Sequence, residues 1–417
     1  MLAQPARPWL KSRAMSLVDS RRARPTEDPI FALNSEANAR RAKGEAVVNA
    51  TLGAAMNDDG SLAILPTAIR ALREVDDVTT AVYAPIAGTS AFLAAVQDDM
   101  IGSVPALRSR SVAVATPGGT GALHHAIVNF LEPGQSMLTT SFYWGPYHTL
   151  TDETGRGLAT FSLFDAKGAF DVAALDRAVG ELLATQGRVL VALNDPCHNP
   201  TGYSMRQEEW RAVAECLTAH AKAGGTVTLL VDAAYIEYAG NPEPRAVLQE
   251  LVPLAEHAQV LFAWSASKSF TMYGLRVGAL IAVVADDKLR AVTQAALTYS
   301  CRGTWSNCNH AGLAAITRLI ADPGYSAQLG TERDALKQLL FSRVTRFNEL
   351  GHAAGLSYPR YEGGFFVTVF HPNAKEQAAR MRETGVFVVP AAGALRVALC
   401  SVPERDVPRL VEALSLS

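Results

Sequence analysis

The chain has 417 residues, of which 49% are hydrophobic and 19% charged, a balance typical of a globular protein with a large buried core. Its formal net charge of −2 and its lack of long basic blocks argue against a nucleic-acid-binding groove, which would concentrate lysine and arginine on one face. No apolar run reaches the roughly 20 residues that a membrane-spanning helix needs. We therefore expect a soluble protein that binds neither nucleic acid nor membranes.

The cysteines indicate a reducing compartment. There are five, an odd number, scattered without the spacing of metal ligands: Cys197, Cys216, Cys301, Cys308 and Cys400. We expect free thiols, no metal site and a cytoplasmic location.

The N-terminal part should begin with a disordered tail over residues 1–25, which is rich in Arg, Ala, Pro and Ser and offers Met15 as an alternative start. A transit peptide is less favoured, because Asp19 is present and no clear amphipathic period is seen. A short amphipathic helix from Asp28 then leads into a strand over residues 47–53. We expect this segment to face a substrate.

Short apolar segments separated by helical stretches predict a mainly parallel sheet covered on both faces. They are residues 112–115, 136–139, 188–193, 226–231, 260–264 and 277–283. Ligands of such sheets collect at the carboxyl ends of strands, so the polar residues that follow the strands should converge there.

The C-terminal part predicts a smaller α+β unit. A long helical pattern over residues 327–350 precedes strand candidates at 364–369 and 395–399. We expect a large domain over residues 61–324 and a small domain built from residues 26–60 and 325–417.

One lysine stands where chemistry can occur. Lys268 follows the apolar run at 260–264, Ser265 and Ser267 precede it, and Arg276 comes eight positions later. An amine there can form an imine, and hydroxyls with a guanidinium suit a phosphate. A lone lysine near serines is more often a surface residue, so other motifs must decide.

Three further motifs point to charged partners. The turn at residues 118–121 (Gly-Gly-Thr-Gly) follows a strand and opens a helix, so its free N–H groups suit an anion. Asp232 ends an apolar strand and Arg396 lies within one, so each needs a partner of opposite charge. A protonated pyridine nitrogen would suit Asp232, and a carboxylate would suit Arg396. Residues 194–202, taken alone, favour an ordinary loop.

From about Asp28 to the C-terminus the chain resembles the fold-type I pyridoxal phosphate enzymes, in particular the aspartate and aromatic aminotransferase branch. Six motifs carry the resemblance in order, at residues 83–88, 117–123, 198–202, 232–235, 265–276 and 395–397. The resemblance implies an α/β fold with a mainly parallel seven-stranded sheet that binds pyridoxal 5'-phosphate, and a homodimer with shared active sites.

The same resemblance implies a role for each motif. Lys268, Asp232 and Tyr235 would be catalytic, with Lys268 bonded to the cofactor and Asp232 paired with the ring nitrogen. Asn199 and Tyr235 would hydrogen-bond the phenolic oxygen of the cofactor. The phosphate would be held by Gly119, Thr120, Ser265, Ser267 and Arg276, with Tyr83 from a second subunit. Arg396 would hold the substrate α-carboxylate.

Some positions depart from the family pattern. Residues 143–148 (Tyr-Trp-Gly-Pro-Tyr-His) stand where the family has Trp-Pro-Asn-His, so Trp144 is the candidate for stacking on the cofactor, with Tyr143 as the alternative. Ala55 stands in a segment where a second glycine is usual. Arg302 lines up with an arginine that binds dicarboxylate side chains from the neighbouring subunit, but Trp305 replaces a smaller aromatic residue. Phe365, Phe366 and Trp305 offer apolar walls to a substrate.

The resemblance implies an aminotransferase that moves an amino group between an α-amino acid, aromatic or large hydrophobic ones being favoured, and a keto acid such as 2-oxoglutarate. Two half-reactions on one cofactor give a ping-pong mechanism. One alternative is another pyridoxal phosphate reaction at the same site, such as β-elimination, decarboxylation or cyclisation. An alternative of another class is a non-catalytic regulator on this fold, which would need a DNA-binding domain, whereas about 25 residues precede the match.

Overall fold

The computed structural model describes residues 17, 18, 21, 24 and 28–416. The disordered tail predicted for residues 1–25 lies almost wholly outside the described residues. The predicted first helix is present as α1, because the side chain of Asp28 accepts the N–H of Ile30 at 2.8 Å and Pro29 begins the first turn.

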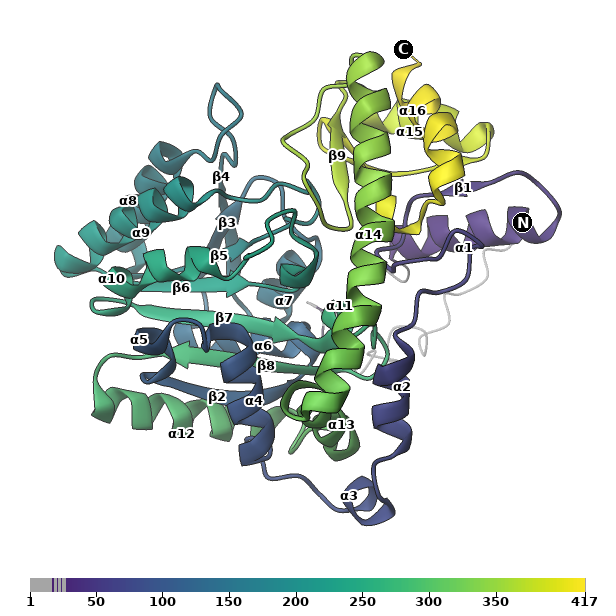
Figure 1. The fold of residues 1–417 in the computed structure, drawn as a ribbon. Helices are drawn as coiled ribbons and strands as arrows, with labels where there is room; N and C mark the ends of the chain where they lie inside the picture. The colour runs from purple at the N-terminus through teal and green to yellow at the C-terminus, as the bar shows by residue number, and fades with distance from the viewer. Residues whose placement is uncertain (1–16, 19–20, 22–23, 25–27, 417) are drawn as a thin grey trace, which may run out of the picture.

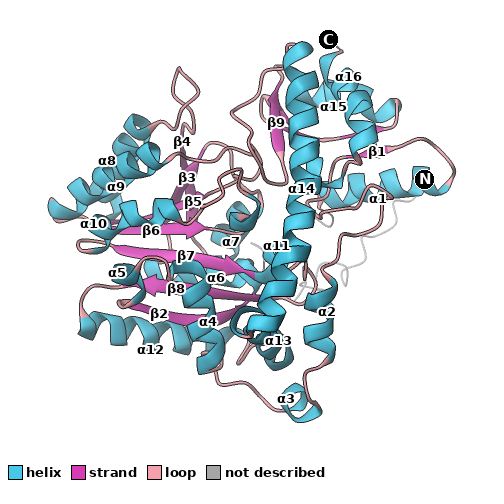
Figure 2. Cartoon of the chain, in the orientation of Figure 1, coloured by secondary structure: helices cyan, strands magenta, loops and turns pink. Residues whose placement is uncertain are grey.

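The helices pack around the sheets (Figures 1 and 2). Their bounds are α1 Pro29–Ala42, α2 Pro66–Arg73, α3 Asp77–Ala81, α4 Ser90–Ile101, α5 Pro105–Arg108, α6 Gly118–Phe130, α7 Pro146–Glu153, α8 Val172–Gln186, α9 Gln207–Lys222, α10 Val252–Ala255, α11 Ala266–Ser269, α12 Asp287–Thr304, α13 His310–Ala321, α14 Pro323–Ala353, α15 Ala374–Glu383 and α16 Val407–Ser415. Among the helices of the described residues, none is both long and apolar enough to cross a membrane.

The strands form one large and two small sheets. Their bounds are β1 Val48–Asn49, β2 Ser111–Pro117, β3 Ser136–Thr140, β4 Gly157–Phe161, β5 Arg188–Asn194, β6 Thr226–Asp232, β7 Gln259–Ser265, β8 Val277–Val283, β9 Val367–Phe370, β10 Val386–Phe387, β11 Val389–Ala391 and β12 Ala394–Val397.

The large sheet has seven strands in the order β2-β8-β7-β6-β5-β3-β4, and β8 alone runs antiparallel to its neighbours. Successive residues of its strands join different apolar clusters: Leu229 and Val231 pack on one face, and Leu230 on the other. Both faces are therefore buried, as continuous apolar strands require. The predicted α/β architecture with a mainly parallel seven-stranded sheet is confirmed.

A separate apolar core lies beyond the large sheet. The sheet β11-β12-β9 and the pair β1-β10 surround residues such as Val367, Leu395 and Leu410. Helix α14 connects the two regions, because Leu336 packs in the core of the large sheet and Phe347 packs in the second core (Figure 1). The second core fits a second domain, but Leu336 lies C-terminal to residue 324 and packs with the large sheet. The division at residues 60/61 and 324/325 stays a proposal.

Candidate active site

Several strands of the large sheet have a polar residue as their last residue, and these strand ends lie at one common edge. Among them β5, β6 and β7 end at Asn194, Asp232 and Ser265. Strand β8 runs the other way and begins at Val277, which pairs with Pro117 at the end of β2. Residue 276 and the glycine turn after Pro117 therefore meet at this edge, where ligands of parallel sheets bind.

A pocket at this edge brings the predicted cofactor residues together. Its lining residues are Gly119, Thr120, Leu123, Trp144, Asn194, Asn199, Asp232, Ala234, Tyr235, Ser265, Ser267, Lys268 and Arg276. Every predicted cofactor-binding residue except Tyr83 is among them. The structure describes both candidates for stacking on the cofactor, and Trp144 lines the pocket whereas Tyr143 does not. Their roles toward a cofactor remain predictions.

One end of the pocket is suited to an anion. Helix α6 begins at Gly118, so the positive end of its dipole and its unpaired N–H groups lie at the pocket. Gly118 has a φ of +72°, and a Cβ there would lie 2.5 Å from Nη2 of Arg276. The guanidinium thus lies directly against the turn, and its Nη1 donates to Oγ of Ser267 at 3.2 Å. A helix N-terminus, hydroxyls and a guanidinium together fit a phosphate group.

The pocket also contains a buried carboxylate. Asp232 is 6% exposed, and burial raises its pKa, although a hydrogen bond from Tyr147 and the charge of Lys268 oppose the rise. Its Oδ2 accepts from Oη of Tyr147 at 2.7 Å, and its Oδ1 accepts from the N–H of Ala234 at 3.3 Å. A carboxylate buried in this way fits a cationic partner such as a protonated ring nitrogen.

Tyr147 is a site residue that sequence reasoning missed. It is fully buried in the first turn of α7, whereas His148, one position later, is exposed. Which of the two points inward depends on the start of α7 at Pro146, since neighbouring helical residues lie about 100° apart. The sequence cue that could have indicated Tyr147 was its spacing from Trp144, three positions earlier. In the structure the two rings make an edge-on contact, with 5.9 Å between their centroids.

Lys268 projects from α11, directly after β7. Its Nζ lies 5.7 Å and 5.5 Å from the ring centroids of Tyr235 and Tyr273. Burial lowers the pKa of Lys268, and the charge of Asp232 works in the opposite direction. A lowered pKa increases the share of neutral amine, the form that attacks a carbonyl carbon.

Asn194, which was expected at this edge of the sheet but was given no role, joins two strand ends. Its Nδ2 donates to the backbone oxygen of Asp232 at 2.8 Å, and its Oδ1 accepts the N–H of Asn199 at 2.7 Å. Asn199 in turn donates from Nδ2 to Oη of Tyr235 at 3.4 Å. Asn194 thereby fixes the turn-rich loop to the end of β6, so this loop positions pocket side chains.

Arg396 approaches from the second core. It is 8% exposed, its Nη2 donates to the backbone oxygen of Thr51, and its guanidinium lies 4.8 Å from the ring centroid of Phe366. Its Nε has no hydrogen-bond partner among the described residues, and burial lowers its pKa. The ring of Phe366 also contacts that of Tyr235, at 5.8 Å between centroids. A buried guanidinium with an unused N–H beside the pocket fits a carboxylate.

Two predicted residues lie on the surface, outside the pocket lining. Tyr83 is 86% exposed. Arg302 is exposed near the end of α12, and its Nη1 donates to Oγ of Ser306 at 2.5 Å. Both residues were assigned to a site shared with a second subunit, and both side chains are accessible for such a contact.

Two predicted substrate contacts lie behind the pocket wall. Ala55 is fully buried, and its N–H donates to Oη of Tyr273 at 3.0 Å. Phe365 is also fully buried, with ring centroids 5.3 Å from Tyr235 and 5.1 Å from Tyr238. Phe365 therefore packs against the pocket residue Tyr235, whereas Ala55 contacts Tyr273, which lies near Lys268 but outside the pocket lining. Phe366 is the phenylalanine that reaches Arg396.

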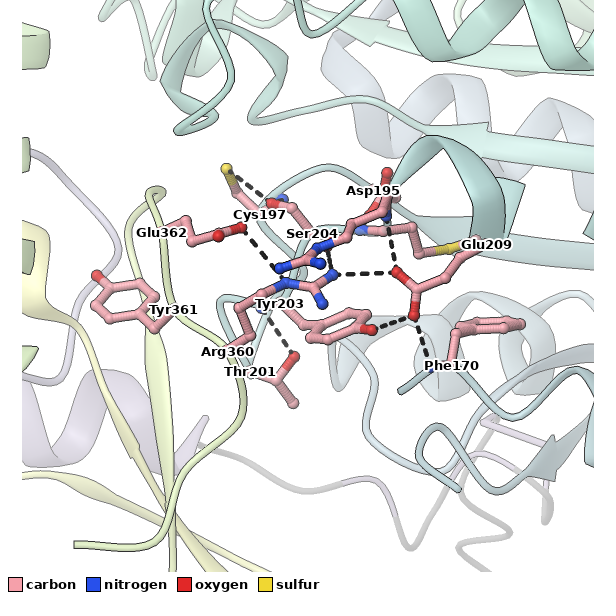
Figure 3. A network of polar contacts seen from close by, with 12 residues as sticks. Phe170, Asp195, Cys197, Thr201, Tyr203, Ser204, Glu209, Arg360, Tyr361 and Glu362 are labelled. Carbon is pink, nitrogen blue, oxygen red and sulfur yellow. Dashed lines mark hydrogen bonds and ion pairs between the residues drawn. The ribbon is translucent and has the colours of Figure 1, made fainter. Parts of the chain in front are cut away.

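A polar network ties the segment between α14 and β9 to the loop after β5. Figure 3 shows Arg360 at its centre, and Nη2 of Arg360 donates to the backbone oxygen of Ser204 at 2.6 Å and to Glu209 at 3.0 Å. Its guanidinium also lies 4.6 Å from the ring centroid of Tyr203. Charged hydrogen bonds of this kind hold two segments in one register. The segment that carries the phenylalanines is thus joined to the loop that carries Asn199.

The residues present fit pyridoxal phosphate. An anion site formed by a helix N-terminus and Arg276, the buried carboxylate of Asp232 and the amine of Lys268 match its phosphate, ring nitrogen and aldehyde. Trp144 supplies an aromatic ring at the same pocket.

The chain is similar to known aminotransferases along most of its length. Residues 48–414 match the family described as aminotransferase class I and II. The aspartate aminotransferase of Pseudomonas aeruginosa is 27% identical over 404 residues, which cover 93% of this chain and 96% of that protein.

Solved structures agree as well. The crystal structure of an aminotransferase from Anaerococcus prevotii superposes with a TM-score of 0.91 at 32% identity, covering 96% of this chain and 98% of the other. An aromatic-amino-acid aminotransferase from Burkholderia pseudomallei, covalently bound to pyridoxal phosphate, has a TM-score of 0.77 at 26% identity, with 96% and 99% coverage. The chain therefore belongs to the class I and II aminotransferases, and it is a pyridoxal-phosphate-dependent transaminase with the aspartate aminotransferase-like fold.

Proposed function

We propose that this transaminase moves an amino group between an aromatic or large hydrophobic α-amino acid and a keto acid such as 2-oxoglutarate, by a ping-pong mechanism. The observation that carries the proposal is the ring of Phe366, which contacts both the buried guanidinium of Arg396 and the pocket residue Tyr235. An aromatic wall beside a carboxylate-binding cation favours a substrate with an apolar side chain. The named relatives include both an aspartate and an aromatic-amino-acid aminotransferase.

Bound pyridoxal phosphate supplies a ring that takes up the electrons left when the substrate α-carbon loses its proton. We assign the ring nitrogen to Asp232, the ring face to Trp144, and the phenolic oxygen to Asn199 and Tyr235. We assign the phosphate to Gly119, Thr120, Ser265, Ser267 and Arg276. Tyr147 and Asn194 hold Asp232 and the loop of Asn199 in place.

Lys268 is the proton carrier in this proposal. Once the substrate amine displaces it, its Nζ removes the α-carbon proton and delivers it to the cofactor. Burial supports this role, because it lowers the pKa of Lys268 and so favours the unprotonated base. Arg396 binds the substrate carboxylate and so aims the α-carbon proton at Nζ.

We further propose a homodimer in which Arg302 and Tyr83 enter the partner's site. Arg302 then binds the dicarboxylate in its half-reaction. Arg302→Ala should lower kcat/KM for the dicarboxylate by a factor that corresponds to about 2–3 kcal/mol of lost transition-state stabilisation, the scale of a lost charged hydrogen bond. The kcat/KM of the same variant for the aromatic substrate should stay within a few-fold of the wild-type value. Steady-state kinetics with both substrates test this, and equal losses would mean that Arg302 acts on the subunit interface alone.

The reaction type is tested by assaying the purified protein with a panel of amino donors and keto acids. Transamination predicts one new amino acid for each keto acid formed, and the Lys268→Ala variant should be inactive. Release of ammonia or pyruvate in place of transfer would favour β-elimination. Borohydride reduction should fix the cofactor to the peptide that contains Lys268, and labelling of another lysine would refute the assignment.

A further inference from the structure

Three potential metal ligands meet on the outer side of the large sheet, away from the active-site pocket. Asp176 lies in α8, and Cys216 and His220 lie in α9, which packs against α8. Figure 1 shows both helices at the left of the view, away from α14. The residues that line the pocket at Lys268 come from other elements.

At the contact between these two helices, each helix has two residues one turn apart on the same face. Cys216 and His220 are four residues apart and so share one face of α9, and Asp176 and Gly180 do the same on α8. A Cβ on Gly180 would lie 3.6 Å from Cε1 of His220, so the imidazole ring lies over the glycine. The imidazole ring thus packs on this part of α8, with its Nε2 turned toward Asp176.

The three side chains converge on one point. Nε2 of His220 and Sγ of Cys216 lie 2.7 Å and 3.7 Å from the same oxygen, Oδ1 of Asp176. The three ligand atoms all lie within 4.8 Å of one another. Ligand atoms bound tetrahedrally at about 2.0–2.3 Å from zinc lie about 3.3–3.8 Å apart. Small side-chain shifts would thus admit the ion.

We propose that Asp176, Cys216 and His220 bind one zinc ion, with the fourth coordination position open to water. A thiolate, an imidazole and a carboxylate form a donor set that suits zinc. The side chains of Asp176 and His220 are 61% and 22% exposed, so solvent reaches the ion. The ion would connect α8 to α9 and stabilise the folded protein. The expectation of no metal site came from sequence spacing, which could not show a ligand from another helix.

Zinc titration of the full-length holoenzyme tests the proposal. The protein is stripped with a chelator, dialysed and titrated with zinc chloride against a chromophoric competitor, and one ion per chain should bind. Cys216→Ser and His220→Gln should each weaken binding by more than about 100-fold, since even an outer-shell partner is worth about 10- to 100-fold. Cobalt in place of zinc should show a thiolate-to-metal absorption band that Cys216→Ser abolishes.

Matched variants separate this site from adventitious binding. Cys308→Ser removes another half-buried thiol and His257→Gln removes an exposed histidine, and neither should alter the affinity. Zinc should raise the Tm of the wild type and of these controls but not of Cys216→Ser. Asp176→Asn, at the most exposed ligand, keeps the test decisive if another variant folds poorly. Absence of stoichiometric binding, or equal affinity in Cys216→Ser and the wild type, would overturn the proposal.

Discussion

Tyr147 gives the buried carboxylate of Asp232 a neutral hydrogen-bond donor. Burial raises the pKa of Tyr147 well above its ordinary value, and the negative charge of Asp232 adds to the effect. The phenol therefore keeps its proton at physiological pH. A neutral donor stabilises the carboxylate form of Asp232 without supplying a positive charge, which suits the proposed pairing of Asp232 with the ring nitrogen of the cofactor.

Replacing Tyr147 by Phe should weaken catalysis. Without the 2.7 Å hydrogen bond the carboxylate of Asp232 is less stable, its pKa rises further, and the ring nitrogen keeps its proton less well. We expect a loss of about 1–3 kcal/mol in kcat/KM and a shifted pH midpoint of the holoenzyme absorbance. His148→Gln, at the exposed neighbour, is the control and should change neither quantity. Unchanged kinetics and absorbance in Tyr147→Phe would show that Asp232 needs no such donor.

His198 should make stability depend on pH. It is 4% exposed, and burial lowers its pKa to about 3, below the unfolded value of about 6.5. The unfolded chain then binds more protons below pH 6.5, so the stability that the neutral ring contributes is lost as pH falls toward 3. Between pH 6 and pH 4 this effect amounts to at most about 1.4 kcal/mol per pH unit.

Denaturant unfolding of the holoenzyme at pH 6, 5 and 4 measures this effect. His198→Gln should show a shallower fall in the free energy of unfolding than the wild type, whatever its absolute stability. His257→Gln, at an exposed site, should keep the wild-type slope. A slope unchanged in His198→Gln would assign the acid sensitivity to other groups.

At the scale of elements, two glycines allow β8 to approach the start of α6. A Cβ on Gly278 would lie 2.4 Å from the carbonyl carbon of Gly118, and one on Gly118 would meet Arg276 at 2.5 Å. A side chain at Gly278 would overlap the backbone of Gly118, and one at Gly118 would have to displace the guanidinium of Arg276. The proposed phosphate site thus depends on the close packing of a strand and a helix N-terminus.

Gly118→Ala should therefore weaken cofactor binding. The new methyl group must displace the guanidinium of Arg276, and the alanine must adopt a φ of +72°. We therefore expect the dissociation constant of pyridoxal phosphate to rise by about 10-fold or more, the scale of one lost charged hydrogen bond. Gly134→Ala is a matched control, since its φ is +84° and a Cβ there meets nothing within 4 Å. It should lose stability and bind the cofactor as the wild type does. Equal affinities in both variants would show that Arg276 is not needed in its present position.

The strands could be predicted where the chain is apolar on both faces. Strand β4 could not, because this edge strand is largely half-buried and lacks a continuous apolar run. The polar residues after β5, β6 and β7 could be brought together in advance, since parallel strands share a carboxyl edge. The orientation of Ala55 and Phe365 could not be predicted, because it depends on how the segments near residues 55 and 365 pack against buried tyrosines at or near the pocket. Local sequence thus indicates which residues reach the edge, and packing decides which face the pocket.

At the scale of the whole molecule, large apolar side chains stand on the surface around the segment before α4. Val78, Val82 and Tyr83, in and directly after α3, are 75%, 52% and 86% exposed. Apolar side chains gathered in one exposed segment are typical of a protein interface. The segment also contains Tyr83, which we propose to reach the phosphate of the partner's cofactor. A two-fold dimer uses the same surface of both chains, so each subunit would then complete the other's site.

Mixing two impaired variants tests whether the active site is shared. Lys268→Ala lacks the proposed catalytic amine, and Tyr83→Ala lacks the residue that we propose to enter the partner's site. In a mixed dimer the site with Lys268 receives an intact Tyr83 from the other chain, so one site in that dimer is complete. Equal mixing with full subunit exchange makes about half of the dimers mixed, which gives about a quarter of the wild-type activity. Tyr83→Ala alone must be strongly impaired, and exchange is checked with subunits of different mass. If each chain builds its own site, the mixture shows only the mean of the two parent activities, because no pairing can then return Tyr83 to a chain that keeps Lys268.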